Sequence, residues 1–205
     1  MIRAIFFDFD GVLTRNERGS TTTIEVIQES HPSLSASTIQ SCYYRFHREL
    51  LLGEKNHGDI WADYCRCIGQ EVCPDILREA FSRTPINEEM IHLASQLARD
   101  YRVGIITDNA ADRMGLLIDQ YGLDTLFDPI VISAAVGKLK DEAELFEKAL
   151  ALSNLKPEEC VFIDNQQKNL LVPAALGLKT CFFDTRQNDI PRLRSQLAEW
   201  GIQIP

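Results

Sequence analysis

Two carboxylates and a glycine directly follow the first apolar run of the sequence. Residues Ala4 to Phe7 show no polar alternation, which is typical of a parallel strand buried on both faces. Asp8 and Asp10 lie two residues apart, so on an extended chain their side chains face the same side, and Gly11 permits a tight turn. Ligands bind beyond the carboxyl ends of such strands, so we expect the two acids to act together. The alternative is a turn with solvated acids.

A hydroxyl, an amide and a lysine follow later strands. Thr107 and Asn109 end an apolar run and open a helix, where they can bind a phosphoryl oxygen together with free backbone N–H groups. Lys140 precedes another helix, and a lysine there can neutralise a phosphate and a neighbouring carboxylate. Helix N-capping for the first two and a solvated loop lysine are the structural alternatives.

A fourth polar end follows the strand Val161 to Ile163. Asp164 and Asn165 stand there, with Asn169 one turn into the next helix. An acid at this point can help to hold a hard divalent cation through oxygen ligands, and its structural alternative is again a helix cap. Each pattern is weak alone, but four polar ends at one edge of a sheet form a more specific pattern.

Alternating helices and strands must position these ends. From about Asn87 the pattern predicts a parallel sheet covered by helices on both faces, with right-handed crossovers. We therefore expect an α/β fold with a Rossmann-like, three-layer parallel sheet core. Its predicted strands after the first are residues 102–107, 129–132, 160–164 and 179–183, and its predicted helices are 88–99, 110–121, 142–151, 168–176 and 190–200.

A small helical segment interrupts the alternation after the first strand. Residues 15–85 contain no convincing strand, and helices are predicted near 22–29, 36–52, 58–68 and 74–81. We expect these residues to form a cap domain over the carboxyl end of the strand, where it excludes water and selects the substrate. Residues 1–14 and 86–205 then form the core domain.

Composition restricts the partners of the 205-residue chain. Its net charge of −9 argues against nucleic acid or an anionic membrane as a partner, since both require basic patches. No apolar run approaches the length of a membrane span, and we expect a soluble, cytoplasmic protein. The six cysteines, without a secretory signal, favour reduced packing thiols over disulfides or a zinc site.

The four polar ends, in this order, resemble the motifs of the haloacid dehalogenase superfamily of hydrolases. Asp8-Phe9-Asp10-Gly11-Val12-Leu13-Thr14 is similar to the first motif, Thr107 with Asn109 to the second, Lys140 to the third, and Asp164 with its neighbour to the fourth. The resemblance covers almost the whole chain. Leu51 to Lys55, followed by Ile60-Trp61, also resembles the cap of small sugar-phosphate phosphatases in this superfamily.

This resemblance implies roles for the motif residues. Asp8 would be the nucleophile that forms an aspartyl-phosphate, and Asp10 would be the general acid and base. Mg²⁺ would be held by Asp8, the backbone carbonyl of Asp10, Asp164 and Asn165. The phosphoryl group would be bound by Thr107, Asn109 and Lys140.

Two positions depart from the family pattern. Asn165 stands where the family usually has a second acid, so we expect weaker binding of Mg²⁺. Asp141 stands where proline commonly follows the motif lysine, and Lys138 lies close enough to be an alternative to Lys140.

The resemblance favours a magnesium-dependent phosphatase that acts on a small phosphorylated metabolite. A sugar-phosphate mutase needs the same nucleophile and acid and is the nearest alternative. A catalytically impaired binding or regulatory protein is suggested by Asn165, but both carboxylates of the first motif argue against it. A dehalogenase is disfavoured, because that branch usually lacks an acid at the position of Asp10. Neither the substrate nor the oligomeric state follows from the sequence.

Overall fold

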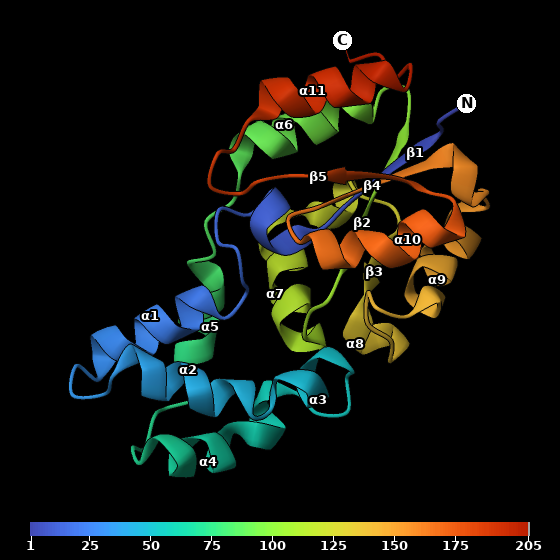
Figure 1. Ribbon diagram of the computed structural model, residues 1–205. Helices are drawn as coiled ribbons and strands as arrows, with labels where there is room; N and C mark the ends of the chain where they lie inside the picture. The colour runs from blue at the N-terminus through green and yellow to red at the C-terminus, as the bar shows by residue number, and fades with distance from the viewer. Residues whose placement is uncertain (205) are drawn as a thin grey trace.

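A five-stranded parallel sheet forms the centre of the computed structural model, which describes residues 1–204 (Figure 1). The strand order is β3-β2-β1-β4-β5, so β1 lies in the middle of the sheet. All residues of β1 are buried, as the unbroken apolar run predicts. The strands are β1 (Ala4–Phe7), β2 (Arg102–Thr107), β3 (Ile130–Ile132), β4 (Cys160–Asp164) and β5 (Lys179–Phe182).

Helices cover both faces of this sheet. Ile5 and Phe7 pack against one set of helices, and Ala4 and Phe6 pack against the other, because successive side chains of a strand point to opposite faces. The first set is α6 (Glu88–Leu97), α7 (Ala111–Tyr121) and α11 (Ile190–Glu199), and the second is α9 (Ala143–Ser153) and α10 (Leu171–Leu176). A short helix, α8 (Ser133–Val136), follows β3. The three layers confirm the predicted α/β fold.

Residues 15–85, which we call the helical insert, lie to one side of the sheet core (Figure 1). An apolar cluster buries Ile39, Tyr64 and Phe81 of the insert, and Ala110 at the start of α7 belongs to the same cluster. The single helix predicted over 36–52 is two helices, because the chain turns at Arg45 and Phe46. The insert contains α1 (Thr21–Ser30), α2 (Ala36–Tyr44), α3 (His47–Leu51), α4 (His57–Ile68) and α5 (Ile76–Ser82).

The two linkers that join the insert to the core run side by side. Thr14 and Ile86 form an antiparallel bridge. The backbone N–H of Arg15 donates to the carbonyl of Pro85 at 2.8 Å, and that of Asn87 donates to the carbonyl of Leu13 at 2.9 Å. The insert therefore leaves and rejoins the core at one place.

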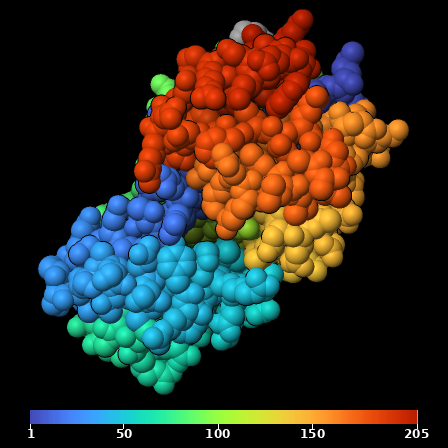
Figure 2. Space-filling model, in the orientation of Figure 1, coloured from blue at the N-terminus to red at the C-terminus, as the bar shows by residue number. Residues whose placement is uncertain are grey.

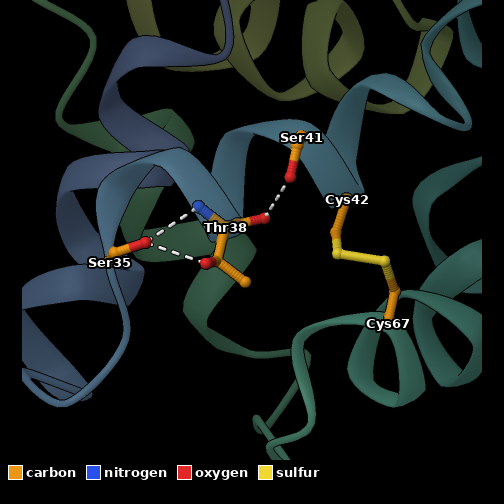
Figure 3. Close-up of a disulfide and its surroundings, with 5 residues drawn as sticks. All are labelled: Ser35, Thr38, Ser41, Cys42 and Cys67. Atoms are coloured by element: carbon orange, nitrogen blue, oxygen red, sulfur yellow. Dashed lines mark hydrogen bonds between the residues drawn. A yellow bond between two sulfur atoms is a disulfide. The ribbon is translucent and has the colours of Figure 1, made fainter.

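A disulfide between Cys42 and Cys67 joins α2 to α4 within the insert (Figure 3). The prediction of reduced thiols was wrong for this pair, because packing of the two helices brings Cα atoms 25 residues apart in sequence to 5.8 Å. Cys65, Cys73, Cys160 and Cys181 are free thiols. None of the described helices is both long and apolar enough to cross a membrane. The cytoplasmic location stays a prediction, and a disulfide, rare in reducing compartments, weighs against it.

Gly104 in β2 tests how tightly the sheet packs on its neighbours. A Cβ at this position would lie 2.7 Å from the carbonyl oxygen of Pro129 and 2.9 Å from the ring of Phe6. We expect Gly104→Ala to lower the free energy of unfolding by about 1–3 kcal/mol, because the backbone must shift to admit the methyl group. The measurement is urea-induced unfolding.

Gly115→Ala is the matched control for this substitution. Gly115 is an exposed position inside α7, and a Cβ there meets no atom within 4 Å. We expect this substitution to raise the free energy of unfolding by up to about 1 kcal/mol, since alanine is the better helix former. Equal effects of the two substitutions would contradict the packing described for β2.

Candidate active site

The carboxyl ends of the three central strands bring the predicted site residues to one edge of the sheet. Phe7, the last residue of β1, is in register with Ile105 of β2 and Ile163 of β4. Asp8 therefore lies between the end of β2, where Thr107 stands, and the end of β4, which is Asp164. Gly11 turns the chain at this edge with φ of +84°, a conformation that favours glycine.

Lys140 lies between two buried carboxylates. Its Nζ is 2.6 Å from Asp8 Oδ1 and 2.7 Å from Asp164 Oδ2, and the side chains of all three are at most 6% exposed. Burial opposes the charge of Lys140, but the neighbouring carboxylates outweigh it and raise the pKa of the ammonium. Burial raises the pKa of Asp8 well above its ordinary value, with Asp164 acting in the same direction and Lys140 against it. The ammonium thus compensates the carboxylates that converge on it.

The other candidate lysine lies outside this group. Lys138 is paired with Glu142 at 2.7 Å and with Glu144 at 3.4 Å, and its side chain is 37% exposed. The structure therefore brings Lys140, and not Lys138, to the strand ends.

Asp10 forms a bidentate ion pair with Arg113. Arg113 Nη1 donates to Asp10 Oδ2 at 2.8 Å, and Nη2 donates to Oδ1 at 2.9 Å. Asn109 Nδ2 donates to the same Oδ2 at 2.8 Å. Both carboxylate oxygens of Asp10 therefore have donors. Arg113 was not predicted as a site residue, although its spacing of four from Asn109 places both on one face of the helix start.

Thr107 and Asn109 stand at the junction of β2 and α7. Both are buried, and the hydroxyl of Thr107 has no hydrogen-bond partner within residues 1–204. Ser133 Oγ accepts the backbone N–H of Asn109 at 2.9 Å, which fixes the turn. Buried hydroxyls are normally hydrogen-bonded. The O–H of Thr107 is therefore a free donor that an oxyanion can accept from.

Asp164 and Asn165 face different surroundings. Asn169 Nδ2 donates to both oxygens of Asp164 at 3.1 Å, which fixes this carboxylate beside Lys140. Asn165 packs on Gly11, and its Nδ2 donates to Thr185 Oγ1 at 3.2 Å. Its Oδ1 is buried and has no donor in the described chain.

A cavity of about 380 Å³ opens between the core and the helical insert. Figure 2 shows the groove that separates the two parts. Asp8, Asp10 and Lys140 line it from the core, and Tyr43 and His47 line it from the insert. The candidate site is thus completed by residues that lie far apart in the sequence.

A hydrogen-bond relay from the half-exposed Asp112 to the buried His57 and Tyr43 joins the insert to α7. Asp112 Oδ1 lies 2.8 Å from His57 Nδ1, and His57 Nε2 lies 2.7 Å from the hydroxyl of Tyr43. Burial opposes ionisation of Asp112, but hydrogen bonds from His57 outweigh it and lower the pKa of the carboxyl. Sequence reasoning missed this relay, because nothing local pairs residues 43, 57 and 112.

The donors at the strand ends fit Mg²⁺. Asp8 and Asp164 already converge on one cation, the ammonium of Lys140, and both offer hard oxygen ligands. No group of three or more His, Cys, Asp or Glu side chains with metal-binding geometry occurs among residues 1–204. A cation here would therefore depend on carbonyls and waters for its remaining ligands, as Mg²⁺ commonly does.

The family model for haloacid dehalogenase-like hydrolases matches residues 2–177 of this chain. The chain belongs to this family of hydrolases. A predicted HAD-like family hydrolase from Porphyromonas gingivalis has a similar structure, with a TM-score of 0.76 and 25% identity over 96% of this chain and 98% of that one. A HAD family enzyme of Bacteroides thetaiotaomicron, solved with magnesium, has a TM-score of 0.78 and 17% identity over 94% and 98% of the two chains, and shows the same fold.

Curated relatives match a shorter region. Glyceraldehyde 3-phosphate phosphatase of Pyrococcus furiosus is 33% identical over 84 residues, which are 40% of this chain and 35% of that protein. Pyrophosphatase PpaX of Bacillus cereus is 31% identical over 80 residues, 39% of this chain and 37% of that protein. The matched region thus spans about a third of each relative.

A double-mutant cycle measures the contact between Arg113 and Asp10. Their side chains are 3% and 12% exposed, and removing one partner leaves the other buried without compensation. We expect Arg113→Met to lower the free energy of unfolding by about 3 kcal/mol. The loss in the double variant Arg113→Met with Asp10→Asn should be smaller than the sum of the single losses, with a coupling energy of about 1–3 kcal/mol.

The exposed pair of Arg3 and Glu159 is the control for this cycle. Their atoms are 3.3 Å apart, and the side chain of Arg3 is 61% exposed. Solvent screens such a pair, so we expect a coupling energy below about 1 kcal/mol. Additive losses at Arg113 and Asp10 would show that their contact does not hold in solution.

Proposed function

We propose that this protein is a magnesium-dependent phosphatase that hydrolyses a small phosphorylated metabolite through an aspartyl-phosphate on Asp8. The observation that carries the proposal is the convergence of Asp8, Asp10, Asn109 and Lys140 on one cavity at the strand ends. The names of the relatives, a glyceraldehyde 3-phosphate phosphatase and a pyrophosphatase, support a phosphorylated substrate.

Asp8 acts as the nucleophile in this proposal. Its Oδ1 accepts from the backbone N–H of Phe9 at 2.7 Å and lies 2.6 Å from Lys140 Nζ. Its Oδ2 accepts no hydrogen bond within residues 1–204, which leaves it free to attack phosphorus. The new bond joins Asp8 to phosphorus while the bond to the leaving oxygen breaks.

Asp10 serves as acid and then as base. It gives a proton to the leaving oxygen, and in the second step it takes a proton from the water that attacks the aspartyl-phosphate. Phosphate is then released and the Asp8 carboxylate is regenerated. Oδ1 of Asp10 accepts one bond, from Arg113, so it keeps a lone pair for this proton, and Asp10 already lines the cavity.

The phosphoryl group binds to Thr107, Asn109 and Lys140. The unpaired hydroxyl of Thr107 and the amide of Asn109 donate to its oxygens, while Lys140 supplies positive charge. Asn109 and Lys140 are already held by their contacts before the substrate arrives, which stabilises the charge that develops during transfer.

Mg²⁺ supplies positive charge that lets the anionic substrate approach the Asp8 carboxylate. We assign its ligands to Asp8, the backbone carbonyl of Asp10, Asp164 and Asn165. Support comes from the carboxylates that already share one cation and from the buried, unpaired Oδ1 of Asn165. The HAD family enzyme of Bacteroides thetaiotaomicron, which has the same fold, was also solved in complex with magnesium and inorganic phosphate.

The helical insert acts as the cap in this proposal. It supplies Tyr43, Tyr44 and His47 to the cavity wall but none of the motif residues. Substrate selection therefore belongs to the insert, and the chemistry belongs to the core. Asp10 argues against dehalogenation, since that branch of the family usually has no acid at this position.

Asp8→Asn should abolish hydrolysis of p-nitrophenyl phosphate, with a loss on the order of a thousandfold or more, because an amide is a poor nucleophile. The measurement is release of p-nitrophenol with Mg²⁺, with EDTA, and after Mg²⁺ is restored. Asp119→Asn is the control, since Asp119 is an exposed acid of α7 outside the cavity. Turnover that survives in the Asp8 variant would overturn the assignment of the nucleophile.

Asn165→Asp restores a charge to the proposed ligand set. We expect the Mg²⁺ concentration for half-maximal activity to fall about tenfold, since a charged oxygen contact replaces a neutral one. The measurement is the initial rate against Mg²⁺ concentration for both proteins. An unchanged or increased requirement would exclude Asn165 from the ligand set.

A further inference from the structure

Three basic side chains line the cavity besides Lys140 and Arg113. Arg18 comes from the linker into the insert, His47 from the start of α3, and Lys168 from the turn before α10. They belong to separate segments, and all three border one cavity in a chain of net charge −9. Their common location therefore needs an explanation.

The cavity's carboxylates do not neutralise Arg18 and Lys168, the two charged members of this group. Neither Arg18 nor Lys168 has a carboxylate within 4 Å in the described part of the chain. The cavity's acids have other partners. Asp8 pairs with Lys140 at 2.6 Å, and Asp10 pairs with Arg113 at 2.8 Å. Glu17 pairs with Arg186 at 2.6 Å, and Asp108 accepts the backbone N–H of Lys140 at 3.0 Å. Arg18 and Lys168 thus remain as uncompensated positive charge.

Tyr44, which also lines the cavity, links Arg18 to His47. Arg18 Nη1 donates to the hydroxyl of Tyr44 at 3.2 Å, and the ring of Tyr44 lies edge-on to His47 at 5.0 Å between centroids. Burial lowers the pKa of His47, and the charges of Arg18, His57 and Lys168 lower it further. His47 is therefore close enough to Arg18 and Lys168 to interact with the charges of both.

We infer that Arg18, His47 and Lys168 form a subsite for a second anionic group of the substrate, a carboxylate or a second phosphate. The inference rests on the proposed function and names its substrate class: small phosphate monoesters with another anion. Lys140 and the strand ends bind the phosphoryl group that is transferred. The basic subsite then binds the anion that stays on the leaving group, and a cavity of about 380 Å³ suits a small metabolite of this kind.

Matched substrates test this inference. For the carboxylate, 3-phosphoglycerate is compared with glycerol 3-phosphate, and for the phosphate, 1,3-propanediol bisphosphate is compared with 3-hydroxypropyl phosphate. We expect kcat/KM to be about 10- to 100-fold higher for at least one substrate that carries the second anion than for its matched substrate without it, as for one or two charge-assisted contacts. The pair with the larger ratio identifies the second anion.

Variants assign that preference to residues. In the double variant Arg18→Gln with Lys168→Gln, we expect the ratio within each pair to fall to about one. Both positions are exposed, so the variant should fold, and its thermal midpoint is measured as a check. Arg45→Gln is the matched control, since Arg45 is an exposed cation of the insert outside the cavity, and it should keep the wild-type ratio.

Three results would overturn the inference in distinguishable ways. If the wild type hydrolyses p-nitrophenyl phosphate but shows ratios near one, the basic subsite is wrong and the phosphatase stands. If it hydrolyses no phosphate ester at all, the proposed function fails and the subsite fails with it. A preference that survives in the double variant would also exclude Arg18 and Lys168 as its source.

Discussion

The buried ammonium of Lys140 is the interaction on which the site depends. Asp8 and Asp164 end adjacent strands and are nearly inaccessible to water, so without a cation between them two carboxylates would be buried together. Such an arrangement is strongly unfavourable, and removing one partner of a buried pair commonly costs several kcal/mol. Lys140 therefore allows Asp8 and Asp164 to be buried side by side at the strand ends.

The first turn of α7 links the acid of the site to the helical insert. Arg113 holds Asp10, while its neighbour Asp112 holds His57 and, through it, Tyr43. A second contact joins the two parts, since Ser133 Oγ donates to the carbonyl of Leu51 at 2.7 Å. A shift of the insert would therefore displace the first turn of α7, which carries Arg113 and so positions Asp10.

Much of the fold and part of the site could be predicted from the sequence. The apolar run before Asp8 and the alternation after Asn87 indicate the sheet, because both patterns are local, and parallel strands place their ends together. The contacts of Arg113, the relay through His57 and the bond between Cys42 and Cys67 could not be predicted in this way. They depend on how helices distant in the sequence pack, and a single sequence carries no local signal for that.

The paired linkers also bear on how the chain folds. Ala4 of β1 pairs only with Arg102 and Cys160, so the central strand is completed by segments that come much later in the chain. Closing a long loop costs entropy that grows with its length, and such distant pairings slow folding. Since the ends of the insert meet at Thr14 and Ile86, a folded insert leaves residues 8–13 and residues 87–101, which include α6, as the chain between β1 and β2 that must still close. A folded insert therefore shortens the loop that must close before β1 and β2 can pair.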